Sequence, residues 1–213
     1  MKQNTLKELY VEELRDLYDG ERQLIKALPK MAKNSNSSEL RNGFVEHLQQ
    51  TKEHAKRVEQ ILEGLGEAPK GKKCKGLRGI VAESAELLGD DFDGDLKDAA
   101  LISAAQRVEH YEIAAHGTVH AFAELLGENE ASSLLEQTLN EEKETDEKLT
   151  QLSQTINPQA LRTGFGVDAG EESKALHKTA KAGGIDRKAA VLGETGKTVR
   201  LGKVEFQCFC SSW

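Results

Sequence analysis

Long apolar runs are missing from this sequence, and residues that favour strands are scarce. Aromatic side chains make up only 5% of the 213 residues, and proline occurs three times. No apolar run approaches the roughly 20 residues that a membrane-spanning helix needs, and the acidic, amphipathic N-terminus is not a secretory signal. The shortage of aromatic and β-branched runs disfavours a sheet protein, whereas the many Leu, Ala, Glu, Gln and Lys residues favour helix.

Cysteine and positive charge are also in short supply. The three cysteines, Cys74, Cys208 and Cys210, do not form an even framework, so disulfides are not expected to hold the fold together. The net charge of −7 disfavours a general nucleic-acid-binding protein, which needs a basic surface. These absences together predict a soluble, cytoplasmic protein with no membrane contact.

What the sequence does have is helical periodicity in four long segments. Leucines recur at steps of three and four residues, which predicts helices over about residues 5–35, 38–64, 96–127 and 130–156. A short helix is expected at about 77–88, inside the long connection between the second and third segments. Pro29 predicts a kink or a weak late turn in the first helix, and Asn157-Pro158 is expected to end the fourth. Two hairpins joined by one long crossover predict an all-α, ferritin-like antiparallel four-helix bundle.

The last quarter of the chain has a different character. Glycine becomes frequent, periodicity fades, and nine Lys/Arg against six Asp/Glu give residues 158–213 a charge of +3, which leaves −10 for residues 1–157. The expected division is therefore a bundle over 1–157 and a flexible, Gly/Lys-rich extension over 158–213. Cys208 and Cys210 alone are too few ligands for a closed metal site.

Polar residues interrupt the apolar stripe of every long helix, near the middle of each. The stretch VEHYEIAAHG (108–117) illustrates this pattern, because it places carboxylates three residues apart on an otherwise apolar face. The polar positions on or beside the four stripes are Glu21, His47, Gln50, Thr51, His54, Glu109, Glu112, His116, Glu142 and Asp146.

A group of buried carboxylates at one level of a bundle needs a source of positive charge. An unpaired buried carboxylate costs several kcal/mol, and grouped carboxylates would mostly protonate. Oxygen ligands with one or two imidazoles suit iron or manganese better than zinc. Each residue taken alone has an ordinary explanation, and Glu142 and Asp146 lie in the charged run NEEKETDEK, which is typical of a solvated face. Their coincidence on four helices favours a di-iron or di-manganese carboxylate centre in the core.

The chain resembles the YciF/YciE-like bacterial stress proteins of the ferritin-like superfamily in four segments: LYVEELRDLYDGERQLIKALPKMAK, FVEHLQQTKEHAKRVEQILEGLG, DAALISAAQRVEHYEIAAHGTVHAFAELLG and LLEQTLNEEKETDEKLTQL. The resemblance covers about residues 5–156. It implies a four-helix bundle, commonly dimeric, with a di-iron or similar metal site and induction under stress, and it implies no established reaction or substrate.

Carried over by position, the resemblance implies five ligand candidates: Glu21, Glu109, Glu112, Glu142 and Asp146. The second helix departs from the family pattern, because Gln50 stands where a glutamate is usual and offers only a neutral oxygen. His54, four residues further on, lies on nearly the same face and is expected to complete the set with Gln50, and Glu53 is a further substitute. No Glu-x-x-His sequence occurs in the chain, so a mono-metal or degenerate site is an open alternative.

Two functions stay open at this stage. The first is a stress-associated metalloprotein that reacts with oxygen or peroxide, or oxidises iron, at a pair of bridged metal ions. The second is a non-enzymatic helical scaffold that acts through dimerisation or through its tail. Metal ions and a second copy of the chain are the expected partners, and the charge of the body disfavours DNA binding by the tail. Tyr18 and Tyr111 are expected to be packing residues, with a redox role near the site as the alternative. His110, His120 and His177 are expected outside the site.

Overall fold

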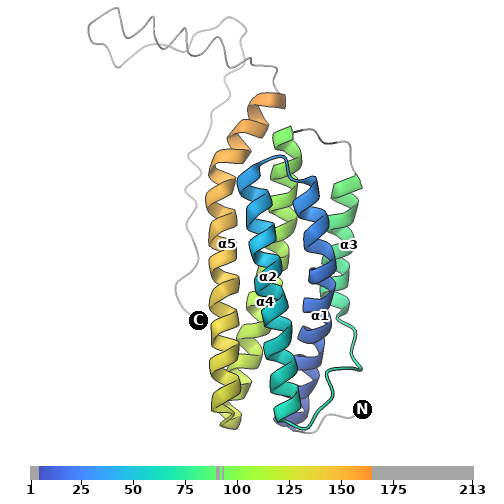
Figure 1. The fold of residues 1–213 in the computed structure, drawn as a ribbon, viewed down its shortest axis with the longest axis vertical. Helices are drawn as coiled ribbons and strands as arrows, with labels where there is room; N and C mark the ends of the chain where they lie inside the picture. Colours follow the sequence, from blue (N-terminus) through green and yellow to red (C-terminus); the bar gives the residue numbers. More distant parts are fainter. Residues whose placement is uncertain (1–4, 90–91, 93, 165–213) are drawn as a thin grey trace, which may run out of the picture. The chain divides into compact units, whose positions relative to one another are not determined.

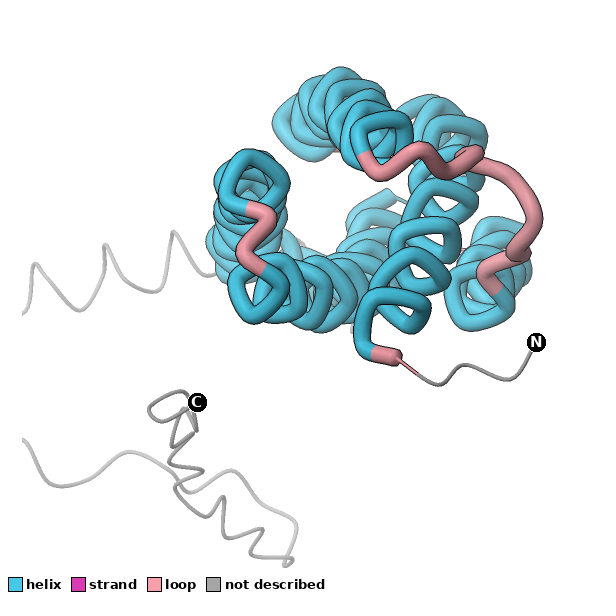
Figure 2. Tube along the Cα trace, turned by 90° about the horizontal axis from the view of Figure 1, so that it is seen from below, coloured by secondary structure: helices cyan, strands magenta, loops and turns pink. Residues whose placement is uncertain are grey.

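The computed structural model describes residues 5–89, 92 and 94–164, and within them the chain is helical, with no strand. In chain order the helices are α1 (Leu6–Asn34), α2 (Ser38–Gly64), α3 (Lys75–Gly89), α4 (Gly94–Leu126) and α5 (Asn129–Gly164). Figure 1 shows the four long helices side by side, with the shorter α3 against α1. Seen end-on in Figure 2, the long helices surround a common centre. The predicted all-α bundle of two hairpins with a short crossover helix is therefore confirmed.

Polar residues start the first two helices at the positions expected from the sequence. Thr5 caps α1 with a capping box, in which its side chain accepts from the Glu8 amide and Glu8 accepts from the Thr5 amide. Ser37, from the loop NSNSS, accepts a hydrogen bond from the Leu40 amide at the start of α2. The buried Asp98 of α4 accepts from the amides of Asn36 and Ser37, and so ties this loop to the second hairpin.

The fourth long helix ends later than the sequence predicted. Asn157-Pro158 was expected to end it, but α5 contains Pro158 and continues to Gly164. Proline removes one backbone hydrogen bond, to the carbonyl of residue 154. Gln154 and Pro158 are both exposed, so water can satisfy that carbonyl and the helix continues. The expected boundary at residue 157 thus falls inside α5, and residues 165–213 of the expected extension lie outside the described residues.

Two apolar clusters fill the bundle, one towards each end. One cluster contains Leu24, Phe44, Val108 and Leu149, one residue from each long helix. The other contains Leu17, Val58, Val119 and Leu135, again one from each. In each long helix a run of buried polar residues lies between these two sets: Glu21 separates Leu17 from Leu24, and the same order recurs in α2, α4 and α5. The buried Asp98 of α4 lies outside this run. The core therefore consists of an apolar layer, a polar layer and a second apolar layer.

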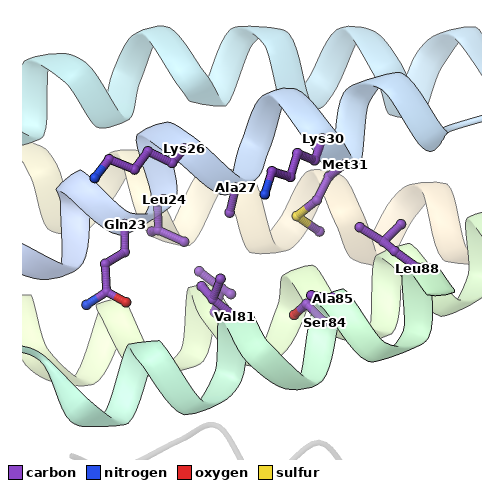
Figure 3. A pocket seen from close by; sticks show the side chains of 11 residues that line it. Gln23, Leu24, Lys26, Ala27, Lys30, Met31, Val81, Ser84, Ala85 and Leu88 are labelled. Carbon is purple, nitrogen blue, oxygen red and sulfur yellow. The ribbon is translucent and has the colours of Figure 1, made fainter.

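The short helix α3 covers one side of the bundle by packing on α1 and α4. Leu24 and Met31 of α1 face Val81 and Leu88 of α3 across a cavity of about 240 Å³ (Figure 3). Gly76 near the start of α3 lies so close to Tyr111 of α4 that a Cβ atom there would meet the ring at 2.7 Å. No helix in the described ranges is both long and apolar enough to cross a membrane.

Candidate metal centre

All four long helices contribute to the polar layer, and its ionisable side chains are almost completely buried. The periodicity of each helix places one or more polar residues on its inward face, at the same level as those of its neighbours. The four carboxyl side chains and three imidazoles, with their exposed fractions, are Glu21 (0%), His47 (2%), His54 (0%), Glu109 (2%), Glu112 (1%), His116 (0%) and Glu142 (0%).

These residues form two groups, in each of which four ligand atoms lie within 4.8 Å of one another. The first group contains Glu21, Glu112, His116 and Glu142, and the second contains His47, Glu109, Glu112 and Glu142. Glu112 and Glu142 belong to both groups. Each group therefore has one histidine and one glutamate of its own, and the two groups are joined by two shared carboxylates.

The first group is centred between α1 and α4. His116 Nε2 lies 2.9 Å from Glu21 Oε1 at hydrogen-bonding geometry. His54 Nδ1 lies 2.8 Å from Glu142 Oε1 and 3.9 Å from Glu21 Oε1. In the described part of the chain, neither His54 Nδ1 nor Glu142 Oε1 has a partner at hydrogen-bonding geometry, although the two atoms are close.

The second group is centred between α2 and α4. His47 Nε2 lies 3.4 Å from Glu109 Oε1 and 3.8 Å from Glu142 Oε2. The Thr145 hydroxyl donates to the Glu141 carbonyl and lies 3.4 Å from His47 Nδ1, so it can only accept from that nitrogen. With a proton on Nδ1, the lone pair of Nε2 faces the carboxyl groups of Glu109 and Glu142, and a metal ion between them would bind all three groups.

A chain of charged groups outside the two groups orients His54. Its Nε2 lies 2.8 Å from Glu141 Oε2, and Arg57 donates to both oxygens of Glu141, at 2.6 and 3.1 Å. Burial raises the pKa of Glu141, but its contacts with Arg57, Gln137 and His54 outweigh burial and lower the pKa to about 2. Glu141 is therefore an anion that holds the imidazole with Nδ1 directed at Glu142 and Glu21. Outer carboxylates commonly orient metal-binding histidines in this way.

The pKa values of the buried carboxyl groups in the layer are shifted in opposite directions. Burial, followed by the charge of Glu142, raises the pKa of Glu109 and of Glu112 well above the ordinary value. Burial also opposes ionisation of Glu142, but the imidazoles of His54, His47 and His116 outweigh it and lower its pKa to about 2. Burial lowers the pKa of His54, and the carboxylates of Glu142, Glu21 and Glu141 outweigh that effect and raise it to about 9. Without a cation, burial and the charge of Glu142 thus favour the protonated forms of Glu109 and Glu112.

Many buried polar atoms of the layer have no hydrogen-bond partner within the described part of the chain, which is costly for each. They are Glu21 Oε2, His47 Nε2, His54 Nδ1, Glu109 Oε2, Glu112 Oε2, His116 Nδ1 and both carboxylate oxygens of Glu142. All are oxygen or nitrogen ligand atoms, and they converge from four helices. A metal ion is the group that such a donor set fits, because it coordinates several carboxylate and imidazole atoms at once.

The structure brings together only some of the seven residues predicted as ligands. Glu21, Glu109, Glu112 and Glu142 lie in the two groups, and His54 lies beside the first. Asp146 is only partly buried and faces outwards, with Oδ1 at 3.6 Å from His110 and 3.4 Å from Gln106. Gln50 is also only partly buried and belongs to neither group. Metal coordination by any of the seven stays a prediction.

The two groups contain His47 and His116, and they contain neither Gln50 nor Asp146. His47 and His116 were recognised as polar residues on the apolar stripes, but neither was among the seven predicted ligands. Glu141 and Arg57 were missed completely. Glu141 directly precedes Glu142 in a charged run, and no local pattern distinguishes it from its exposed neighbours; only the pairing of α2 with α5 brings it to His54.

A narrow cavity between α2 and α5 reaches the second group from outside. Its volume is about 30 Å³, enough for a water molecule. Gln50 lines this cavity together with His47, Glu109 and Thr145, and Lys148, paired with Glu46 at 2.9 Å, lines it as well. Gln50 therefore lines a cavity beside the second group, together with two of its members.

Known proteins are similar to this chain in both sequence and fold. The family described as a domain of unknown function, DUF892, matches residues 5–162. Protein YciF from Escherichia coli (strain K12) is 40% identical over 154 residues, which are 72% of this chain and 93% of that protein. The crystal structure of the E. coli stress protein YciF matches with a TM-score of 0.71 at 38% identity, covering 73% of this chain and 99% of that chain.

Two further solved structures are similar. YcfI from Rhodopseudomonas palustris is 39% identical with a TM-score of 0.67, covering 69% of this chain and 94% of that chain. A protein from Xanthomonas campestris pv. campestris, 21% identical, has a TM-score of 0.61 over 75% of this chain and 99% of that chain, and it shows the same fold.

Proposed function

The chain belongs to the DUF892 family, with the YciF-like resemblance confirmed, and we propose that it is a stress-associated protein whose buried polar layer binds two metal ions. The observation that carries the proposal is the sharing of Glu112 and Glu142 between two four-ligand groups. Shared carboxylates are how paired metal ions are bridged in four-helix carboxylate proteins. The association with stress rests on the relative that is named a stress protein.

The charges of the layer support a pair of divalent cations. Glu21, Glu109, Glu112 and Glu142 together supply four negative charges when ionised, which two divalent ions balance. One ion would be held by Glu21 and His116, the other by Glu109 and His47, and both by Glu112 and Glu142. Carboxylates with one imidazole for each ion suit iron or manganese better than zinc or copper. Such ions supply one-electron redox chemistry when bound, which makes reaction with oxygen or peroxide, or oxidation of iron, the activity we propose.

The protein's own groups would prepare the layer for this binding. Arg57 and Glu141 orient His54 beside Glu142, and the Thr145 hydroxyl orients His47 with Nε2 directed inwards. Because burial raises the pKa of Glu109 and of Glu112, protons compete with metal ions for both carboxyl groups, and metal uptake is expected to release protons. Binding should therefore tighten as pH rises. A homodimer stays a prediction from the family resemblance.

Metal content measured by elemental analysis tests this proposal. The purified chain is incubated anaerobically with excess Fe(II) or Mn(II) and desalted, and the expected content is two ions per chain, one for each group. The variant Glu142→Ala removes a ligand that both groups share, so it should lose both ions. The matched variant Glu144→Ala, which removes an exposed carboxylate two residues away on α5, should retain them.

Circular dichroism separates loss of a ligand from loss of the fold. Glu142→Ala should keep the helical spectrum of the wild type while losing metal. Wild-type chain that is fully helical and yet contains almost no metal after loading would contradict the proposal, and would favour the alternative of a helical scaffold with a polar core.

A further inference from the structure

A further concave surface lies outside the polar layer, between α1, the start of α3 and the loop that joins α2 to α3. Its volume is about 700 Å³. Among its lining residues Asp19 is the one acid, against six cations: Arg22, Lys26, Lys70, Lys72, Lys73 and Arg78. The whole chain carries a net charge of −7, so this surface, which we name the basic pocket, is a local reversal of sign.

Only two of the six cations are neutralised by the fold. Lys72 lies 3.2 Å from Glu13 and 3.5 Å from Asp16, and Lys73 lies 2.9 Å from Asp19. The other four have no ion-pair partner among the residues that the structure describes: Arg22, Lys26, Lys70 and Arg78. Arg22 lies over the ring of Tyr18, with its guanidinium carbon 5.7 Å from the ring centre. The pocket therefore holds four cations without an ion-pair partner in the described part of the chain, and six cations against three acids leave a surplus of three positive charges.

The loop between α2 and α3, which carries Lys70, Lys72 and Lys73, is hydrogen-bonded to α1. The amide of Cys74 donates to Asp19 Oδ2, and the Gln23 amide group donates to the Cys74 carbonyl. Gly71 has φ +126°, a conformation that residues with side chains rarely adopt, and it allows the tight turn between Lys70 and Lys72. The cations are thus held near one another by the backbone and by the acids of α1.

Repulsion between the unpaired cations of the basic pocket raises the free energy of the folded state, and no ion pair in the described fold offsets it. Charges of one sign in a concave surface with low-dielectric walls concentrate the field there and raise the local concentration of anions. The four unpaired cations contribute no ion pair to stability, so a structural role does not account for them. An anion bound in the pocket would recover the cost.

The type of anion follows from the cations and from the aromatic ring beside them. Arginine matches phosphate oxygens through paired N–H groups, and lysine adds point charges, so two arginines and two lysines exceed the need of a single carboxylate. Tyr18 is the one aromatic residue among the described lining, its ring is covered by Arg22, and its hydroxyl donates to Glu59 at 3.1 Å. The one aromatic ring in the lining thus already has Arg22 over one face, which disfavours stacking on a nucleobase there.

We propose that the basic pocket binds a small oligophosphate, that is, two or more linked phosphate groups, and recognises it by charge and not by any group attached to it. This binding is separate from the metal centre and does not depend on it.

Isothermal titration calorimetry of the full-length chain with sodium tripolyphosphate, in metal-free buffer, tests the proposal. The double variant Lys70→Gln/Arg78→Gln removes two exposed cations that make no ion pair in the described structure, and it should weaken binding by about tenfold or more. The control Lys33→Gln/Arg162→Gln removes the same charges from exposed positions elsewhere on α1 and α5, and it should weaken binding by less than about twofold. Equal weakening in both variants, or no saturable binding to the wild type, would overturn the proposal.

Binding of other phosphate-containing ligands and of adenosine shows which chemical group the basic pocket recognises. ATP should bind about as tightly as tripolyphosphate, inorganic phosphate much more weakly, and adenosine not at all. Adenosine monophosphate that binds more tightly than tripolyphosphate would show recognition of the base and would refute the proposal. A short DNA duplex that displaces tripolyphosphate at a lower phosphate concentration would replace it with a nucleic-acid site.

Discussion

Replacement of Glu112 by glutamine is expected to stabilise the metal-free protein at neutral pH. Glu112 is 1% exposed, and its Oε2 has no hydrogen-bond partner among the described residues. Burial and the charge of Glu142 raise its pKa well above 4.5, so the folded state retains a proton that the unfolded state releases. Because the folded state then binds more protons, the free energy of unfolding falls as pH rises above 4.5. Glutamine has nearly the same shape and no proton to release.

The size of this effect follows from proton linkage. For each pH unit above 4.5, up to the raised pKa of Glu112, the wild type loses about 1.4 kcal/mol of stability that the variant keeps. The two proteins should be about equally stable near pH 4.5, and the gap should widen with rising pH until the raised pKa of Glu112 is passed. With metal bound the order reverses, because glutamine replaces a carboxylate shared by both groups.

Urea unfolding at several pH values, followed by circular dichroism with chelator present, measures the gap. The matched control is Glu144→Gln, an exposed carboxylate on α5, which should not change the pH dependence. An unchanged slope of stability against pH in Glu112→Gln, or a variant less stable than the wild type at every pH, would refute the reasoning about charge in the layer.

Three further predictions concern the same structure. The metal-free wild type should lose up to roughly 3 kcal/mol of stability through His54 as pH rises from 6.5 to 9. The raised pKa of His54 stabilises the folded state below pH 6.5, and this stabilisation is lost as pH rises through the folded pKa. Urea unfolding of His54→Gln should lack this part of the loss. Gly76→Ala should destabilise by about 1–3 kcal/mol in thermal unfolding, since its Cβ would meet the Tyr111 ring at 2.7 Å, whereas Gly43→Ala, with no atom within 4 Å, should be neutral or stabilising. Asp98→Ala should cost about 2–4 kcal/mol in urea unfolding, because it leaves the amides of Asn36 and Ser37 without their acceptor; equal stability of the variant and wild type would contradict that role.

Helical periodicity alone was enough to predict the fold and the level of the polar residues. The stripe positions of α1, α2 and α4 are buried as expected, because a 3.6-residue period fixes which side chains share a face. The end of α5 was predicted wrongly because a local rule for proline does not include the exposure of the freed carbonyl at residue 154. Periodicity also predicted that Glu21 and Glu142 face the centre, and they do.

The composition of the two groups depends on the relative rotation of neighbouring helices, which one sequence does not specify. Asp146 is four residues after Glu142 and was placed on the same stripe, but a helix advances 400° over four residues, and the extra rotation turns Asp146 towards His110. His47 was considered an ordinary interface histidine, and its contacts with Glu109 and Glu142 come from α4 and α5. Gln50 attracted notice through the family pattern, yet it lines the cavity beside the layer.

Anomalous X-ray diffraction from crystals of the chain loaded with Mn(II) or Fe(II) tests the central claim most directly. We expect two anomalous peaks inside the bundle, both adjacent to Glu112 and Glu142, with His116 beside one and His47 beside the other. Peaks only at exposed carboxylates, or saturated crystals with no peak in the polar layer, would contradict it.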